Sequence, residues 1–325
     1  MRAIVRQQYG GPEQLVIQEV PDPELRAGHV NIAVKAFGIN HAETYMRKGD
    51  WGDVAKVSGI ECVGVVKADP DGRLAAGQKV VALMGGMGRT IDGSYAEYTR
   101  VPASNVVPIE SALPWEDLAA VPESYATAWT CLHGNLALRA GQTLVIRGAT
   151  SALGRAALSI AAVEGASVIA TTRNRDRIAK LEGLGAKRVE IEGPDLAQRL
   201  RKSYPRGVDA VLDLIGNSTL LDSLAAVRRS GHVCLAGFLG GLAPIAAFNP
   251  LLQMPSGVHF SFFGSFTYGM PEFPLSDIPM QTIVERVAGG IYRAKPAKVF
   301  RFEEIREAHR LMESSQANGK IVVAV

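Results

Sequence analysis

The sequence predicts an α/β protein in which a sheet-rich part comes first and a doubly wound parallel sheet follows. Three observations predict this class. Short apolar segments broken by Gly, Pro and Asp fill the chain to about residue 121, strands and helices alternate from about residue 123, and residues 319–325 form a last apolar segment. Alternating strands and helices indicate a parallel sheet covered on both faces, whereas consecutive short strands indicate a separate sheet.

The N-terminal part is mostly β. Strands are predicted at residues 15–20, 29–36, 62–66 and 79–83, and turn signals such as Pro70-Asp71-Gly72 separate them. No helical periodicity of useful length occurs before Trp115. Crossover helices therefore cannot connect these strands, and we expect a domain with its own sheet.

The second part predicts a parallel sheet. Strands are expected at residues 143–149, 167–172, 188–192, 209–215 and 231–238, with a sixth at 259–265. Residues 173–185 form the clearest helix and end in glycine. After a loop-like stretch at 242–255, helices are expected near 280–289 and 302–314. The last strand needs a sheet, and the N-terminal one is available, so the expected domains are 1–122 plus 266–325, and 123–265.

The stretch from Gly148 to Gly154 joins an apolar strand to an Ala-rich helix. Small residues in such a turn let the backbone approach a pyrophosphate, whose charge then faces the N–H groups of the helix N-terminus. Ala149 and Ser151 replace the first two glycines of a strict G-x-G-x-x-G pattern, so the motif alone is weak. The strand–turn–helix–strand context strengthens it. The alternative is a Gly-containing turn in some other α/β protein.

The end of the second strand predicts the cofactor. An NAD-specific site places Asp or Glu there, about 20 residues beyond the turn, to bind the ribose 2′-hydroxyl. This chain has Thr171 and Thr172, then Arg173, Asn174, Arg175 and Arg177. Guanidinium groups suit a 2′-phosphate, so NADPH is expected, with Arg173 the first candidate and Arg177 the second. The alternative is a solvated basic helix start, although cations oppose the helix dipole there. Asp176 is expected to cap or pair on the outer face.

Composition narrows the class of protein. The chain of 325 residues is 47% hydrophobic, and 35 Lys and Arg nearly balance 32 Asp and Glu, without a dense basic run. Nucleic-acid binding is therefore not indicated. Three cysteines far apart in sequence favour a reducing compartment. No run of 18 or more apolar residues occurs, and we expect a cytoplasmic protein.

Five blocks in order carry a resemblance to a known family. They are Gly38-Ile39-Asn40 followed by Glu43, Tyr45, Arg47 and Gly49; residues 58–66; residues 93–98; the turn at 148–154; and residues 319–322. On these blocks the chain resembles the medium-chain dehydrogenase/reductase superfamily, in its zinc-independent quinone oxidoreductase branch. The resemblance covers nearly the whole chain. It implies a GroES-like β domain interrupted in sequence by a Rossmann domain.

The resemblance also implies that no zinc is bound. Zinc-dependent relatives hold the metal with Cys, His and Cys, and the matching positions here are Asn40, Ile60 and Glu123. A lone carboxylate cannot supply a tetrahedral set of ligands. The segment 84–93 contains no cysteine for a structural zinc lobe. Glu61, beside Ile60, is expected to be structural.

The resemblance places Asn40 and Tyr45 at the nicotinamide, and both are candidate catalytic residues. The alternatives are a loop residue for Asn40 and a packing aromatic for Tyr45. His41 is a lone loop histidine, more often solvated than catalytic. Arg47 is expected to orient the loop without a direct role.

Position within the family suggests further contacts with the cofactor. Thr127 and Phe238 are expected near the nicotinamide and Phe263 near the subunit edge, although all three could simply pack. The full set of expected cofactor-binding residues is Asn40, Thr127, Gly148, Ala149, Thr150, Ser151, Ala152, Leu153, Gly154, Thr172, Arg173, Asn174, Arg177, Phe238 and Lys320.

These observations favour an NADPH-dependent reductase of a quinone or an α,β-unsaturated carbonyl compound, without flavin. A non-catalytic, crystallin-like NADPH-binding protein is the alternative, and a zinc alcohol dehydrogenase is less favoured. No basic strip with interleaved aromatics supports nucleic-acid binding. The apolar sixth strand lies at a sheet edge, and the resemblance implies that it pairs with the same strand of a second copy in a homodimer.

Overall fold

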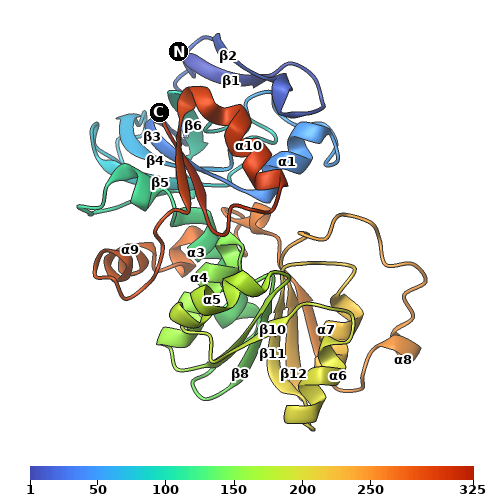
Figure 1. Cartoon of the computed structure of the whole chain (residues 1–325). Helices are drawn as coiled ribbons and strands as arrows, with labels where there is room; N and C mark the ends of the chain where they lie inside the picture. Colours follow the sequence, from blue (N-terminus) through green and yellow to red (C-terminus); the bar gives the residue numbers. More distant parts are fainter. The chain divides into compact units, whose positions relative to one another are not determined.

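The computed structural model describes all 325 residues, and the chain divides into two compact units. The first unit comprises residues 1–126, 265–290 and 294–325, and the second comprises 127–264 with 291–293. Figure 1 follows the chain through both units. No helix in the chain combines the length and the apolar character needed to cross a membrane.

The first unit is built on a seven-stranded sheet. Its order is β14-β15-β3-β4-β5-β7, and β6 pairs with β3 off this path. The strands are β3 (His29–Ile39), β4 (Glu61–Ala68), β5 (Lys79–Leu83), β6 (Tyr98–Pro102), β7 (Val106–Pro108), β14 (Lys298–Arg301) and β15 (Ile321–Ala324). A separate antiparallel pair consists of β1 (Arg2–Arg6) and β2 (Leu15–Glu19). The four strands predicted from the N-terminal sequence are confirmed.

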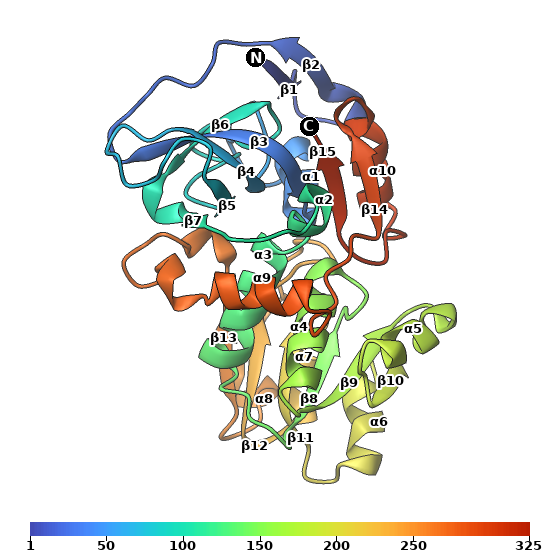
Figure 2. The ribbon, with the colours of Figure 1, turned by 90° about the vertical axis from the view of Figure 1, so that its left-hand side faces the viewer.

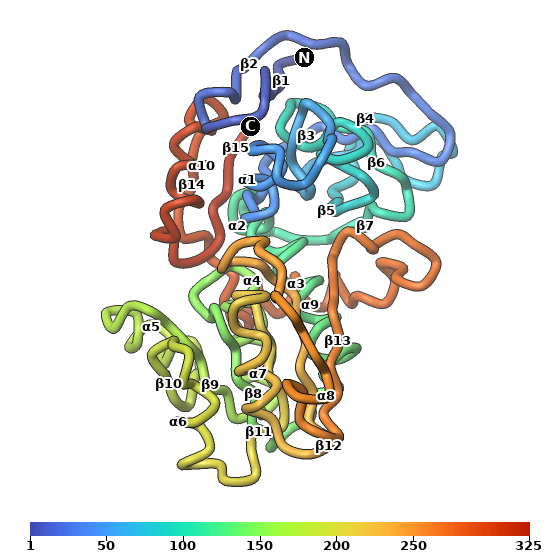
Figure 3. The backbone as a smooth tube through the Cα atoms, turned by 90° about the vertical axis from the view of Figure 1, so that its right-hand side faces the viewer, coloured from blue at the N-terminus to red at the C-terminus, as the bar shows by residue number.

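The last strand joins the N-terminal sheet, as predicted. β15 runs antiparallel to β3, with Ile321 opposite Ile39, and β14 adds a parallel neighbour on its other side. Helix α10 (Ile305–Glu313) packs against both β14 and β15 (Figure 2, Figure 3). Residues distant in sequence therefore complete one sheet.

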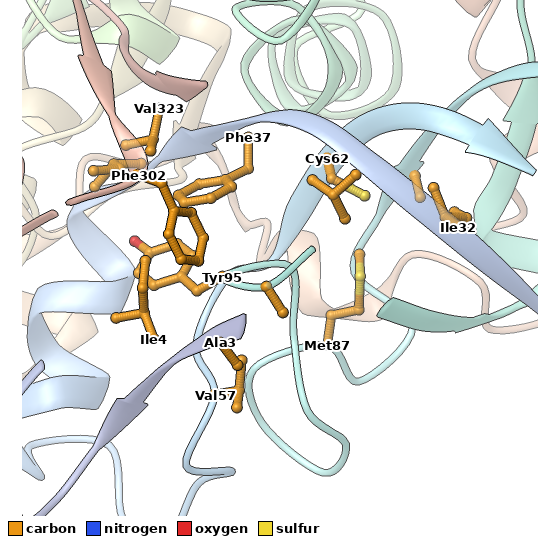
Figure 4. Close-up of a cluster of buried hydrophobic side chains, with 14 of the residues drawn as sticks. Ala3, Ile4, Ile32, Phe37, Val57, Cys62, Met87, Tyr95, Phe302 and Val323 are labelled. Atoms are coloured by element: carbon orange, nitrogen blue, oxygen red, sulfur yellow. The ribbon is translucent and has the colours of Figure 1, made fainter. Parts of the chain in front are cut away.

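Aromatic packing marks the core of the first unit. Phe37 and Tyr95 stack with ring centroids 4.6 Å apart, and Phe302 meets Phe37 edge-on at 6.5 Å. Figure 4 shows these rings among smaller apolar side chains from several strands. Such aromatic pairs prefer stacked or edge-to-face geometry. The core thus joins β3 to the C-terminal segment.

The prediction that no helix of useful length precedes Trp115 was wrong, because helix α1 spans His41–Lys48. Asn40 is its N-cap, the Glu43 carboxylate accepts a hydrogen bond from the Asn40 backbone N–H at 2.8 Å, and Gly49 ends the helix with φ 89°. Its buried face includes the charged residues Glu43 and Arg47. Hydrophobic periodicity could not detect a helix whose buried face is partly charged.

The other helices of this unit follow the sequence more closely. They are α2 (Trp115–Leu118), α3 (Pro122–Trp129, which continues into the second unit), α9 (Met280–Ala288) and α10. The helices predicted near 280–289 and 302–314 are confirmed, although a 3-10 turn over Phe302–Glu304 precedes α10.

The second unit contains a six-stranded parallel sheet with the order β10-β9-β8-β11-β12-β13. Figure 2 shows β10 and β13 at its opposite edges. The strands are β8 (Thr143–Arg147), β9 (Ser167–Thr172), β10 (Arg188–Ile191), β11 (Val208–Asp213), β12 (Val227–Leu235) and β13 (His259–Phe262). All six predicted strands are confirmed, and the sixth is shorter than expected.

Helices connect these strands. They are α4 (Ala152–Val163), α5 (Ile178–Gly183), α6 (Leu196–Ser203), α7 (Leu220–Ala226) and the short α8 (Pro250–Gln253). Helices α6 and α7 lie side by side on the sheet (Figure 1). The helix predicted over 173–185 is shorter, because a 3-10 turn over Arg175–Arg177 precedes α5. A π-helical turn over Thr130–Asn135 extends α3.

The strand order identifies where this sheet binds a ligand. β8 lies between β9 and β11, so the connections run outward on opposite sides of β8. In open α/β sheets ligands bind at the carboxyl ends of strands where the order reverses. Arg147 and Asp213 are paired at the ends of β8 and β11. The turn that follows β8 therefore starts at this point.

Candidate functional site

The turn after β8 is held by hydrogen bonds of the Ser151 side chain, and glycine stands at a position where a larger residue would clash. The Ser151 hydroxyl accepts from the Gly154 N–H at 3.0 Å and donates to the Gly148 carbonyl at 2.9 Å, which caps α4. Gly148 has φ 80°. A Cβ on Gly154 would lie 2.5 Å from the Gly148 carbonyl oxygen. A compact turn leading into a helix N-terminus fits the pyrophosphate of a dinucleotide.

The end of β9 carries hydroxyl groups in place of a carboxylate. The strand ends at Thr172, whose hydroxyl accepts from the Asn174 N–H at 3.1 Å. The Asn174 side chain accepts from the Asp176 N–H at 2.8 Å. Asn174, and not Asp176, thus caps the following turn, because it stands at the N-cap position, two residues before the N–H that its side-chain oxygen accepts from in an Asx turn. Arg173 follows the strand and is exposed.

A basic cluster lies beyond this strand end. Arg177 donates to the Thr150 hydroxyl at 3.4 Å. The turn after β8 and the segment after β9 therefore meet. Burial lowers the pKa of Lys180, and the nearby charges of Arg155 and Arg177 lower it further. The sequence analysis missed Lys180 and Arg155, although Lys180 stands three residues after Arg177, on the same helix face. Mutual repulsion among these cations favours binding of an anion.

Thr127, Phe238 and Phe263 occupy packed positions in the second unit. Thr127 lies on α3 and is buried. Phe238 is half-buried, with its ring centroid 6.1 Å from that of Phe262. Phe263 follows β13 directly and is buried. Their expected roles stay predictions.

In the first unit, Asn40 and Lys320 meet at a buried carboxylate. The Lys320 ammonium donates to the Asn40 side-chain oxygen at 2.6 Å and to Glu61, while the Asn40 amide donates to Glu61 at 2.8 Å. Glu61 also accepts from the Glu123 backbone N–H at 2.8 Å. The side chains of Lys320 and Glu61 are 4% and 0% exposed. Glu61 therefore holds together three distant parts of the chain.

Glu43 adds a second buried carboxyl group that the sequence analysis did not assign to the site. Besides capping α1, it accepts from the Ile60 N–H at 3.4 Å. Burial raises the pKa of Glu43 to about 8, and the charge of Glu61 adds to this while Lys320 opposes it. The Asn-x-x-Glu spacing of a capping box was the available signal.

Tyr45 lies on α1 among aromatic neighbours. Its ring centroid is 5.0 Å from that of His41, edge-on, and 6.2 Å from that of Trp51. Burial raises the pKa of the Tyr45 hydroxyl, with a contribution from Asp50, so the hydroxyl stays protonated. Burial, with Lys48 nearby, lowers the pKa of His41. His41 is thus a neutral packing partner of Tyr45, and its description as a loop histidine was wrong.

Arg47 anchors α1 from inside the unit, in agreement with its expected orienting role. Its fully buried guanidinium donates to the Gly10 carbonyl, to Glu313 and, at 3.4 Å, to His309. The other ring nitrogen of His309 lies 3.1 Å from the Tyr95 hydroxyl. Burial lowers the pKa of His309 to about 3, with a contribution from the charge of Arg47.

The positions compared with zinc ligands carry other interactions. The Asn40 amide bonds to Glu61 and Lys320, Ile60 is a buried apolar side chain, and Glu123 accepts from the Ser265 hydroxyl at 3.1 Å. No group of three or more His, Cys, Asp or Glu side chains that could hold a metal occurs in the chain.

Two family models match the chain. The alcohol dehydrogenase GroES-like domain matches residues 26–111, and the zinc-binding dehydrogenase model matches residues 152–279. A quinone oxidoreductase of Lama guanicoe is 27% identical over 99% of this chain and 97% of its own length. A 2-haloacrylate reductase of a Burkholderia species is 27% identical over 99% of this chain and 98% of its own. The solved structure of an NAD-dependent alcohol dehydrogenase has a TM-score of 0.83 at 28% identity, covering both chains fully.

The two units are a GroES-like domain and a Rossmann domain, the combination found in nicotinamide-dependent oxidoreductases of two-domain architecture. The chain belongs to the medium-chain dehydrogenase/reductase superfamily, in its quinone oxidoreductase branch. It is an oxidoreductase that uses a nicotinamide cofactor and acts on a small molecule.

Proposed function

We propose that this chain is an NADPH-dependent reductase that transfers a hydride to a quinone or an α,β-unsaturated carbonyl compound, without zinc or flavin. The observation that carries the choice of NADPH is the end of β9, where Thr171 and Thr172 precede the exposed Arg173. The names of the quinone oxidoreductase and 2-haloacrylate reductase relatives support the substrate class.

Charge at the end of β9 distinguishes the two cofactors. A carboxylate on β9 would bond a ribose 2′-hydroxyl and repel a 2′-phosphate. Arg173 and Arg177 can instead bond the phosphate, and Lys180 adds to the positive potential. A charge-assisted hydrogen bond contributes roughly 1.5 to 3 kcal/mol, and about 1.4 kcal/mol is tenfold. We therefore expect a roughly tenfold to hundredfold preference for NADPH.

The experiment measures kcat/KM for NADPH and NADH in the wild type, in Arg173→Ala and in Arg177→Ala. Each substitution should lower the preference, because each removes a cation that faces the phosphate. Arg206→Ala removes an exposed arginine outside this segment and serves as the matched control. Equal kcat/KM values in the wild type, or an unchanged ratio in both variants, would refute the assignment.

Hydride transfer to a conjugated carbonyl compound leaves negative charge on the oxygen. A bound nicotinamide cofactor supplies the hydride. We assign Tyr45 and Asn40 as hydrogen-bond donors to that oxygen, because a donor aimed at developing charge lowers the barrier. Lys320 and Glu61 hold the Asn40 amide in one orientation. Lys320 thereby positions Asn40, in addition to its expected contact with the cofactor.

Zinc does not fit the residues of the first unit. The Lys320 ammonium occupies the place beside Glu61 and Asn40 where a dication would need oxygen ligands. A cation already paired there disfavours a second one electrostatically. Ile60 offers no ligand. Reduction without a metal Lewis acid agrees with an electron-poor substrate that stabilises charge itself.

The proposed assembly is a homodimer through β13. This edge strand has β12 as its one neighbour within the chain. Phe260 and Phe262 on it are 38% and 49% exposed. Exposed apolar edges of sheets are usually paired or covered, and pairing with the same strand of a second copy would satisfy both the backbone and the apolar side chains.

A non-catalytic, crystallin-like NADPH-binding protein is the alternative. It predicts cofactor binding without turnover. Adding a panel of quinones and enones to enzyme and NADPH distinguishes the two, because steady oxidation of NADPH requires catalysis. Binding of NADPH with no oxidation across the panel would favour the alternative.

A further inference from the structure

A buried arginine at the end of β8 connects the end of β10 to helix α7 in the second unit. Arg147 ends β8, and its side chain is 1% exposed. It donates to Glu192, which follows β10, and to Asp222 on α7 at 2.7 Å. It also reaches the Ser223 hydroxyl at 3.1 Å. Cations inside proteins are normally paired in this way, because an unpaired buried charge is costly.

Glu192 brings a carboxylate to the end of β9 although β9 itself has none. The Thr171 hydroxyl donates to Glu192 at 2.8 Å and accepts from the Gly148 N–H at 3.2 Å. Glu192 therefore lies one hydrogen bond from the strand end where the ribose of a dinucleotide is expected. A free carboxylate there would favour a 2′-hydroxyl and repel a 2′-phosphate.

Arg147 offsets that carboxylate. Its guanidinium contacts Glu192 through two nitrogens, one of them at 3.3 Å. The Glu192 side chain is 8% exposed, so solvent screens its charge poorly and the guanidinium is its main counter-charge. The second partner, Asp222, lies on α7 and accepts from the Ala197 N–H at 3.2 Å, whereas Glu192 accepts from the Thr171 hydroxyl.

We propose that Arg147 is a specificity-determining residue for the cofactor: by neutralising Glu192 beside Thr171, it makes the end of β9 compatible with a 2′-phosphate. The inference rests on the proposed NADPH preference and adds a residue that does not touch the phosphate. Two roles are thereby distinguished. Arg173 and Arg177 attract the 2′-phosphate, whereas Arg147 cancels the repulsion between the 2′-phosphate and Glu192, which follows β10.

The proposal predicts shifts of opposite sign. Glu192→Gln removes the negative charge, keeps the side-chain shape, and should raise the ratio Kd(NADH)/Kd(NADPH). Arg147→Met leaves Glu192 without its counter-charge and should lower that ratio roughly tenfold, equivalent to about 1.4 kcal/mol. The double variant has neither charge and should return close to the wild-type ratio. A role limited to folding would weaken both cofactors together and leave the ratio unchanged.

The experiment titrates NADPH and NADH into each full-length variant and follows binding by fluorescence, with circular dichroism as the check on folding. Asp222→Asn is the matched control, because it removes an equal charge from the same guanidinium, but from a carboxylate that bonds the Ala197 N–H and not the Thr171 hydroxyl. Its ratio should shift less than that of Glu192→Gln. If Arg147→Met does not fold, the cofactor ratios of Glu192→Gln and Asp222→Asn still test the proposal.

Two results would overturn the inference: an unchanged or lower ratio in Glu192→Gln, or equal shifts in Glu192→Gln and Asp222→Asn. Failure of the proposed function looks different. In that case the wild type itself binds NADH as tightly as NADPH, or binds neither, before any substitution at Arg147 or Glu192 is made.

Discussion

Asn40 shows how one side chain can be held for chemistry by its neighbours. Its amide oxygen accepts from Lys320 and its amide nitrogen donates to Glu61. These two bonds fix the orientation of the amide, because a flipped amide would lose both of them. Tyr45, five residues further along the chain and on α1, is held by aromatic contacts instead. The two side chains therefore respond differently to substitution.

Replacing these donors should slow reduction of an enone more than that of a quinone. Losing one hydrogen bond to a developing oxyanion costs on the order of 100-fold in turnover, whereas a quinone delocalises the charge itself. Tyr45→Phe and Asn40→Ala are measured for kcat on one enone and one quinone. Tyr9→Phe, which removes an exposed hydroxyl bonded to the Gly52 carbonyl at 3.1 Å, is the control. Wild-type turnover of both variants on every accepted substrate would exclude both residues from the chemistry.

At the scale of an element, α1 is stabilised by contacts that differ from those of an ordinary amphipathic helix. Glu43 accepts from the backbone N–H of Asn40 at the helix start, and Arg47 bonds three partners inside the unit. Buried ionisable groups of this kind make stability depend on pH whenever their pKa differs between the folded and unfolded chain.

Glu43 should make the wild type lose stability as pH rises. The pKa of its carboxyl is raised from 4.5 to about 8 in the folded protein, so the folded chain binds the proton more tightly than the unfolded chain. Its contribution is complete below about pH 4.5 and is lost as pH rises through about 8, by at most about 1.4 kcal/mol per pH unit.

Glu43→Gln should remove this dependence, because glutamine stays neutral. The measurement is the difference in thermal midpoint between wild type and variant at pH 5, 7 and 9, with the exposed Glu24→Gln as control. The thermal midpoint of the wild type, relative to that of Glu43→Gln, should be highest at pH 5 and lowest at pH 9. A difference that stays constant with pH, as expected for Glu24→Gln, would contradict the role of Glu43.

At the scale of the whole molecule, the proposed dimer depends on the edge strand β13 of the second unit. If two copies pair through β13, the protein should sediment as a dimer at micromolar concentration. Phe262→Lys should shift it toward monomer, because a buried unpaired charge opposes pairing. Val163→Lys changes a similarly exposed apolar residue on α4, 46% exposed, and should leave the dimer intact. A wild-type monomer, or a dimer indifferent to Phe262→Lys, would rule out this interface.

Metal content is a second property of the whole molecule. Elemental analysis of the purified protein should find no stoichiometric zinc, and activity should survive a chelator, because Lys320 and Ile60 stand where ligands would be needed. Zinc near one equivalent per chain, lost together with activity on chelation, would show that the proposal is wrong.

The sequence by itself determined the features that depend on neighbours along the chain. The strands of both units, the strand–turn–helix at Gly148 and the hydroxyl-bearing end of β9 were all predicted, because alternation, glycine placement and residue spacing are local signals. Local reasoning missed α1, since its buried face carries Glu43 and Arg47 and resembles no apolar stripe.

Only the tertiary structure decided which distant side chains meet. Lys320 bonds Asn40 across 280 residues, Arg47 bonds His309 across 262, and Arg147 bonds Glu192 across 45. Such pairs form only when the tertiary fold brings separate strands and helices together, and no local pattern specifies that arrangement. The carboxylate that the sequence of β9 lacks is therefore brought to its end by β10, where burial and a paired guanidinium determine its effect.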